Sequence, residues 1–184
     1  MRALVVYESM YGNTHAVAVS IAAGLSTRHD VTLVPVTRAT PELVAAADLL
    51  VAGGPTHLHR MSTAASRRWA AAAARKQGSG LTMDPDADGP GVRGWLEGVG
   101  SLGGRSTLAV AFDTRLSGVP LFTGRASRGI SRLLAGHGCR MFAAPESFLV
   151  SKKDTLRDGE TARARAWGAM IGAAASDLYA PTVA

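Results

Sequence analysis

Residues 9–14 read Ser-Met-Tyr-Gly-Asn-Thr and lie between two runs of different character. The apolar run Ala3–Tyr7 precedes them and predicts a buried strand, and the run Thr14–Leu25 predicts a helix. The N–H groups in the first turn of a helix lack intrahelical partners and carry partial positive charge. A tight loop between a strand and a helix N-terminus therefore predicts a phosphate-binding site.

The side chains of this loop suit a singly phosphorylated ligand. Ser9, Asn13 and Thr14 offer hydroxyl and amide donors, and Gly12 lets the backbone close around an anion. The loop contains no Lys or Arg, so neutral donors would hold the phosphate. This favours a phosphate monoester over a triphosphate with magnesium. The alternative is an ordinary strand-to-helix turn with a good N-cap.

The loop resembles the FMN-phosphate loop of flavodoxins, whose pattern is Ser/Thr-x-Ser/Thr-Gly-x-Thr. Tyr11 departs from that pattern at its third position, but the form found here is similar to that of flavodiiron flavodoxin domains. The resemblance implies FMN as the cofactor. Its phosphate would be held by Ser9, Met10, Tyr11, Gly12, Asn13 and Thr14.

A second loop follows the apolar strand predicted at Leu49–Ala52, and residues 53–62 read Gly-Gly-Pro-Thr-His-Leu-His-Arg-Met-Ser. It resembles the Gly-x-Pro-Thr-x-x-x-x-Met-Ser loop of flavodoxin-like proteins, which lies against the isoalloxazine ring. The resemblance implies that one side of the ring contacts Pro55, Thr56, His57 and Leu58.

This second loop departs from the family in two ways: it lacks a stacking aromatic residue, and no glycine follows Gly54 in it. Relatives often carry a glycine here, where a peptide flips toward flavin N5. Because side chains other than glycine rarely adopt a positive φ, such a flip is expected to cost more at Leu58, His59 or Arg60.

A third loop ends the strand predicted at Ser106–Asp113, and the resemblance places it on the other side of the flavin. The residues implied there are Phe112, Asp113, Thr114 and Arg115. A cation near flavin N1 or the pyrimidine would favour the anionic reduced form. The alternative for Arg115 is a surface ion pair with Asp113.

The remaining patterns alternate strands with helices. Further strands are predicted at Val31–Val36 and, in two halves, at Cys139–Ala143 and Ser147–Val150. Further helices are predicted at 41–47, 61–77, 92–99, 124–137 and 159–179, with Trp69 as a packing residue. This alternation predicts an α/β fold with a parallel sheet and right-handed crossovers. The resemblance implies a flavodoxin-like three-layer sandwich, with a five-stranded parallel sheet of order 2-1-3-4-5 and helices on both faces.

The C-terminal run from Leu156 to Gly168 resembles the closing segment of actinobacterial-type flavodoxin-domain proteins. The likeness then extends from Arg2 to about Tyr179. We expect one flavodoxin-like FMN-binding domain over residues 1–179, a mobile Gly/Asp/Pro insertion at 78–91, and a tail at 180–184.

The composition bounds the remaining possibilities. Of 184 residues 47% are hydrophobic and 18% charged, which is typical of a globular chain. The net charge of +6 carries no dense Lys/Arg block and aromatics are 5%, so a solvated basic surface is favoured over nucleic-acid binding. A single cysteine, no signal peptide and no long apolar stretch predict a cytoplasmic protein without a membrane partner.

The leading interpretation is an FMN-binding redox protein that transfers electrons to or from a partner protein, either a reductase or an acceptor. One alternative is an FMN-dependent NAD(P)H or quinone reductase acting on a small quinone-like substrate. Another is a flavin-free scaffold of the same fold. No catalytic side chain is predicted, and a metal at His57-x-His59 is disfavoured because no Cys, Asp or Glu is close in sequence. The oligomeric state is left open.

Overall fold

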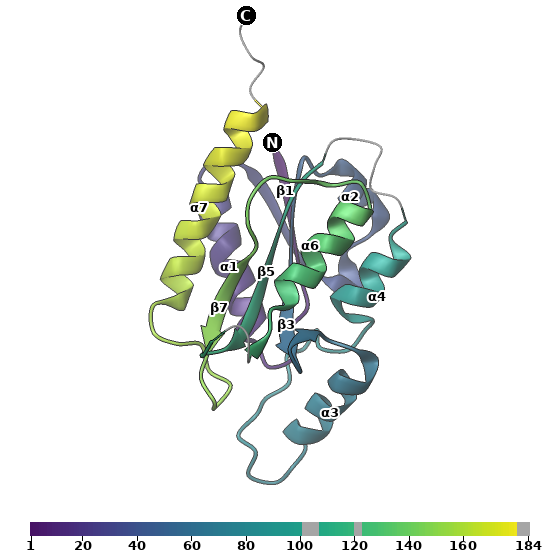
Figure 1. Cartoon of the computed structure of the whole chain (residues 1–184), viewed down its shortest axis with the longest axis vertical. Coiled ribbons are helices and arrows are strands. Elements are labelled where there is room, and N and C mark those ends of the chain that lie inside the picture. The colour runs from purple at the N-terminus through teal and green to yellow at the C-terminus, as the bar shows by residue number, and fades with distance from the viewer. Residues whose placement is uncertain (101–106, 120–122, 180–184) are drawn as a thin grey trace, which may run out of the picture.

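The computed structural model describes residues 1–100, 107–119 and 123–179. Its centre is a parallel sheet in the order β2-β1-β3-β5, followed by β6 and β7, with helices on both faces (Figure 1). The strands are β1 Arg2–Tyr7, β2 Asp30–Pro35, β3 Leu49–His57, β4 Arg60–Met61, β5 Leu108–Leu116, β6 Arg140–Met141 and β7 Glu146–Val150. The predicted fold class is confirmed. The sheet has seven strands instead of five because the fifth position is divided and the short β4 pairs antiparallel with β3.

The helices form the two outer layers. They are α1 Asn13–Leu25, η1 Val36–Arg38, α2 Pro41–Ala46, α3 Ala64–Ala74, α4 Gly91–Gly98, α6 Ala126–Gly136 and α7 Glu160–Tyr179. Helices α1 and α7 cover one face of the sheet, and α2, α4 and α6 cover the other. Helix α3 lies beyond the carboxyl ends of the strands (Figure 1). The predicted Ser106 strand start and the predicted tail at 180–184 lie outside the described residues.

Strand β1 shows how the apolar runs build the core. All residues from Ala3 to Tyr7 are buried. Because successive side chains of a strand point to opposite faces, Val5 and Tyr7 join the cluster under α1 and α7, whereas Leu4 and Val6 join the cluster on the other face. A central parallel strand therefore needs an uninterrupted apolar run, as predicted.

Glycines bring α1 and α7 into close contact. A Cβ atom on Gly24 would lie 2.1 Å from the backbone oxygen of Arg165, and one on Gly168 would lie 2.3 Å from that of Ile21. The two helix backbones therefore approach to a distance that a side chain at either position would prevent.

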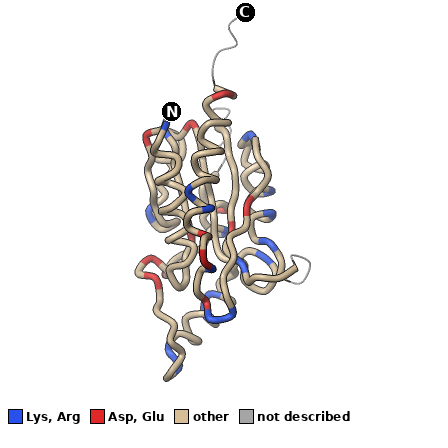
Figure 2. The backbone as a smooth tube through the Cα atoms, turned by 90° about the vertical axis from the view of Figure 1, so that its left-hand side faces the viewer, with Lys and Arg blue, Asp and Glu red and all other residues tan. Residues whose placement is uncertain are grey.

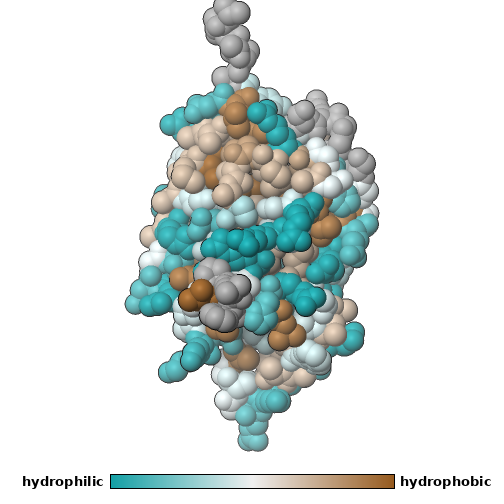
Figure 3. Space-filling view, viewed as in Figure 1, coloured by the Kyte–Doolittle hydropathy of each residue, from teal (hydrophilic) through white to brown (hydrophobic). Residues whose placement is uncertain are grey.

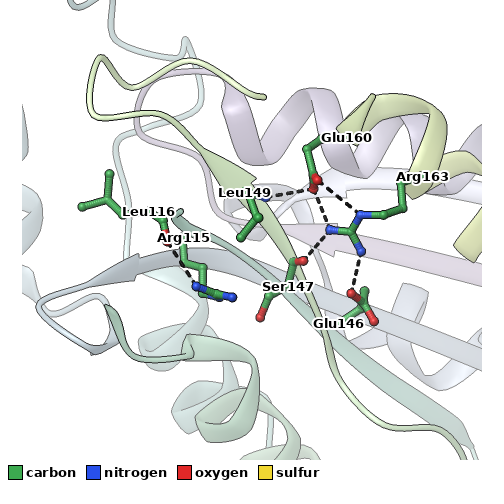
Figure 4. A network of polar contacts seen from close by, with 7 residues as sticks. All are labelled: Arg115, Leu116, Glu146, Ser147, Leu149, Glu160 and Arg163. Atoms are coloured by element: carbon green, nitrogen blue, oxygen red, sulfur yellow. Dashed lines mark hydrogen bonds and ion pairs between the residues drawn. The ribbon is translucent and has the colours of Figure 1, made fainter. Parts of the chain in front are cut away.

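Arg163 fastens the second half of the divided fifth strand to α7 (Figure 4). Its guanidinium donates to Glu146 Oε1 at 2.6 Å, to Glu160 Oε2 at 2.6 Å and to the Ser147 oxygen at 2.5 Å. It also lies 4.4 Å from the centre of the Phe148 ring. These contacts hold β7 beside β5, so that the carboxyl ends of both strands reach the same edge of the sheet.

Both ends of the described chain meet at Asp48, at the edge of the sheet opposite those carboxyl ends. The N–H of Arg2 donates to Asp48 Oδ2 at 2.8 Å, and the Tyr179 hydroxyl donates to Asp48 Oδ1 at 3.2 Å. Figure 1 shows the first strand and the last helix reaching this edge together.

Candidate functional site

A cleft of about 150 Å³ opens at the carboxyl edge of the sheet, and we call it the edge cleft. Its walls come from the loop after β1, the C-terminal ends of β3, β5 and β7, and the loop after β7. The residues that line it are Met10, Tyr11, Asn13, Thr14, Pro55, Thr56, His57, Thr114, Arg115, Leu116, Val150 and Asp154. The structure therefore brings together nine residues predicted from three distant segments. The predicted residues that do not line the cleft are Ser9, Gly12, Leu58, Phe112 and Asp113.

The loop at residues 9–14 leads directly into helix α1. Gly12 is the N-cap residue and adopts φ +87°, with open space where a Cβ would stand. The N–H of Gly12 donates to Ser9 Oγ at 3.1 Å, and Ser9 is buried. Ser9 thus fixes the turn of the loop, while the free first-turn N–H groups of α1 stay directed at the carboxyl edge.

A pair of threonine hydroxyls joins the first and third loops. Thr14 Oγ1 and Thr114 Oγ1 lie 2.7 Å apart, and both side chains are buried at the wall of the edge cleft. Because one hydroxyl donates within the pair, the other keeps a hydrogen for a further acceptor.

Asn13 connects this loop to the segment after β7. Its Nδ2 donates to the backbone oxygen of Asp154 at 2.7 Å, and its Oδ1 accepts from the N–H of Leu156 at 3.1 Å. The side chains Val150 and Asp154 were missed by the sequence prediction. The rule that all parallel strands of a sheet end at one edge could have included them.

The second loop forms a β-hairpin between β3 and β4, in which His57 pairs with Arg60. The two turn residues have positive φ angles, 47° at Leu58 and 72° at His59. The sequence predicted that this conformation would be unfavourable without glycine, yet the structure adopts it. The reason is tertiary: His59 bridges to Gly124, whose missing side chain allows the close approach.

Replacing Leu58 with glycine tests how much strain this turn holds. The left-handed conformation costs an L-residue roughly 1–2 kcal/mol, and glycine adopts it freely at an entropic cost of about 0.5–1 kcal/mol. Leu58 is 65% exposed, so little packing is lost. We expect Leu58→Gly to raise the free energy of unfolding by about 0.5–1 kcal/mol in urea titration. A lower free energy of unfolding in Leu58→Gly would show that the left-handed conformation of Leu58 is not strained.

His57 lies in the hairpin itself and is half-buried. Its Nδ1 lies 3.2 Å from Ser66 Oγ, and burial lowers its pKa even though the Glu8 carboxylate acts in the opposite direction. Glu8 is itself buried and accepts from the N–H of Val92 at 2.8 Å. The Glu8 carboxylate is therefore an acceptor for the first turn of α4.

Phe112 does not reach the edge cleft, which corrects the prediction that it would contact a flavin. Its side chain is fully buried, packs edge-on against Phe148 at a centroid distance of 6.4 Å, and occupies the space above Gly53. Thr114 lies two residues after Phe112 in β5, so its side chain points to the same face of the sheet. It reaches the cleft because it lies nearer the end of the strand.

Asp113 also faces the interior. Its Oδ2 accepts from the N–H of Ser127 at 2.7 Å, which fixes the first turn of α6. Asp113 is fully buried, and this burial raises the pKa of its carboxyl group. Its place in the fold is therefore that of an acceptor for a helix N-terminus.

Arg115 lines the edge cleft, but its guanidinium is held by its own loop. Nη1 donates to the backbone oxygens of Leu116 at 3.1 Å and Gly118 at 3.0 Å, and to Thr123 Oγ1 at 2.9 Å. It is buried, and the ion pairs between described residues do not include one with Asp113. The expected alternative of a surface ion pair is therefore wrong.

The segment 78–91 packs beside the first loop. It contains no helix or strand before α4, but Asp84 is buried, donates its N–H to the Met10 oxygen at 2.8 Å and lies 3.3 Å from His15 Nδ1. Burial, with the nearby Asp86 and Asp84 carboxylates, raises the pKa of Tyr7 to about 12. The mobility of this segment stays a prediction.

A parallel sheet of this order, with a phosphate-type loop after its first strand, defines a flavodoxin-like α/β protein. The chain belongs to the flavodoxin family, because the family model described as Flavodoxin matches residues 5–142. FMN is the cofactor of this family. No match was found among curated proteins. The described helices include none with the length and apolarity needed to cross a membrane.

Solved structures share the fold at low sequence identity. A flavodoxin from the domain Archaea is 17% identical with a TM-score of 0.63, covering 96% of this chain and 99% of that one. Flavodoxin 2 from Bacillus cereus is 18% identical with a TM-score of 0.62, covering 95% and 99%. The flavodiiron protein from Giardia intestinalis is 19% identical with a TM-score of 0.58, covering 98% of this chain and 38% of its own.

Proposed function

We propose that this chain is an electron-transfer protein that holds FMN at the edge cleft and exchanges electrons with a partner protein. The observation that supports the proposal best is the convergence of three predicted flavin loops on this one cleft. Bound FMN would supply the redox-active ring, and the protein would supply binding, orientation and access. No side-chain nucleophile is needed for that role.

The phosphate of FMN would lie at the N-terminus of α1. The first-turn N–H groups there and the spare hydrogen of the Thr14–Thr114 hydroxyl pair can all donate to phosphate oxygens. The open space at Gly12 admits the close approach of an anion to the backbone. These neutral donors suit a monoester phosphate.

The ring would contact Pro55, Thr56 and His57 on one side and Thr114 and Arg115 on the other. The edge cleft is smaller than the roughly 300–1,000 Å³ of most ligand pockets, so it would accept only part of the flavin. The bonds of Asn13 to the segment after β7 close one wall of the cleft. They are the contacts that FMN entry is expected to displace.

The proposal is tested first by the visible absorption spectrum of the purified protein, before and after incubation with FMN and desalting. Retained flavin bands are expected. A protein that keeps no flavin would overturn the proposal and favour the flavin-free scaffold. With flavin retained, oxidation of NAD(P)H by the protein alone would favour the reductase alternative over partner-dependent transfer.

The substitution Thr14→Val tests the phosphate contact. Valine keeps the shape but removes the hydroxyl, and a hydrogen bond to a charged group contributes about 1.5–3 kcal/mol. We therefore expect FMN affinity, measured by quenching of flavin fluorescence, to fall about tenfold or more. The matched control is Thr32→Val, an exposed position on edge strand β2, which should leave affinity unchanged. Equal affinities in both variants would remove Thr14 from the site.

A further inference from the structure

A second and larger hollow, of about 940 Å³, lies beside the β3–β4 hairpin. Five arginines line it, and we call it the arginine groove: Arg60, Arg93, Arg125, Arg128 and Arg132. Basic residues are spread over much of the backbone in Figure 2, and Figure 3 shows hydrophilic side chains across the middle of the face that carries α6. The groove concentrates this charge in one concavity.

The sequence places these arginines together by helical spacing and by topology. Arg125, Arg128 and Arg132 are three and four residues apart at the start of α6 and along it, so they share one side of the helix. Arg93 comes from α4 and Arg60 from β4. Gly129 of α6 lies between Arg128 and Arg132 and leaves room for β4, since a Cβ atom there would lie 2.7 Å from Met61 Sδ.

The positive charge of the groove is not neutralised within the described part of the chain. None of the five arginines takes part in an ion pair between described residues, and no Asp or Glu lines the groove. Among the described residues, Arg125 Nε is buried without a hydrogen-bond partner, and Arg93 makes one side-chain hydrogen bond, a long one of 3.4 Å to the Ser62 oxygen. Converging guanidinium groups repel one another, and an anion between them would relieve that repulsion.

We propose that the arginine groove binds adjacent phosphate groups of a small phosphorylated ligand. Each guanidinium presents a planar fork of donors that matches two phosphate oxygens, and several forks converging from three elements match a diphosphate better than a single charge. The volume falls within the range of small-molecule sites, and the lining is cationic instead of apolar. A concave cavity of this kind favours a small ligand over the surface of an acidic protein.

The groove adjoins the candidate cofactor site. His59 and Gly124, which meet at the tip of the hairpin, line the groove, while His57 of the same hairpin lines the edge cleft. A ligand held by its phosphates in the groove would lie on one side of the hairpin and FMN on the other. The inference stands on the arginines themselves and does not depend on FMN binding.

The test is calorimetric titration of the purified protein with pyrophosphate, ATP, NADPH and adenosine at fixed ionic strength. The three phosphorylated probes should bind and adenosine should not, with affinity falling as salt rises. Comparable binding of all three would identify an inorganic polyphosphate as a sufficient ligand. Tighter binding of ATP or NADPH than of pyrophosphate would identify a nucleotide.

Variants separate the groove from the phosphate loop after β1. Arg128→Gln and Arg132→Gln change exposed side chains of α6, and each should weaken pyrophosphate binding about tenfold through loss of a charge-assisted contact. Arg165→Gln, on the exposed side of α7, is the matched control and should bind as the wild type does. Thr14→Val should also leave pyrophosphate binding intact, even if it abolishes FMN binding.

Three results would overturn the inference. They are the absence of binding by every phosphorylated probe, equal weakening by Arg165→Gln, and binding of a poly-glutamate peptide more tightly than any phosphate. Loss of pyrophosphate binding in Thr14→Val with no effect of the α6 variants would assign the phosphate to the loop after β1 and also count against the groove.

Discussion

Gly124→Ala is expected to lower the free energy of unfolding by about 3 kcal/mol. A Cβ at this position would lie 2.1–2.3 Å from the backbone of His59, which cannot move without opening the β3–β4 hairpin. Gly124 also has φ +72°, where alanine costs roughly 1–2 kcal/mol, and forced overpacking costs about 1–3 kcal/mol more. Urea titration followed by circular dichroism measures the loss.

The same substitution should also weaken ligand binding, because the hairpin forms a wall of both the edge cleft and the arginine groove. The matched control is Gly100→Ala. Gly100 has φ +71° but no atom of the described residues within 4 Å of an added Cβ, so it reports the conformational cost alone, about 1–2 kcal/mol. If the two variants lose the same stability and the folded Gly124→Ala protein binds FMN normally, the contact with His59 has no role in fixing the hairpin.

The second large effect is expected at the α1–α7 interface. Gly168→Ala would place a Cβ 2.3 Å from the Ile21 oxygen, and Gly24→Ala would place one 2.1 Å from the Arg165 oxygen. Both obstacles are backbone atoms, so the helices must separate. Each variant should lose about 3 kcal/mol, the upper part of the range for overpacking.

Gly98→Ala provides the control for this pair. Gly98 is the last residue of α4, and the described part of the chain places no atom within 4 Å of an added Cβ there. Alanine has a higher helix propensity, so a small gain of about 0.5 kcal/mol is expected. A gain at Gly168 or Gly24 as well would show that the helices have room that the structure does not indicate.

The fold was predictable because its signals are local and repeated. Apolar runs such as Ala3–Tyr7 predict strands buried on both faces, and the loop at residues 9–14 predicts a helix N-terminus. The rule that parallel strands end at one edge then brings distant loops together. Nine residues of the edge cleft followed from these signals and the family resemblance.

The wrong predictions concern positions at which tertiary contacts determine the exposure of a side chain or the conformation of a turn. Because residues 108–112 of β5 are all apolar, pattern alone could not show that Phe112 lies too far from the strand end to leave the core. Trp69 was expected to pack, but it is 65% exposed because α3 extends beyond the sheet. The left-handed turn at Leu58 depends on Gly124, which is distant in sequence.

The arginine groove was missed for the same reason. Its residues are separated by up to 72 positions along the chain, from Arg60 to Arg132, and none of them is part of an adjacent basic pair. The search for dense Lys/Arg blocks in the sequence therefore predicted only a solvated basic surface. The five arginines come together in one groove only because α6 packs beside β4 and α4.

The meeting of Arg2 and Tyr179 at Asp48 has a practical consequence for immobilising the protein on a surface. Since Arg2 and Tyr179 hydrogen-bond the same carboxylate at the edge opposite the cleft, the two ends of the described chain lie at the same place. A protein immobilised on an electrode through either end would present the cleft outward to solution. A short peptide joining the two ends would likewise permit new termini to be opened elsewhere in the chain.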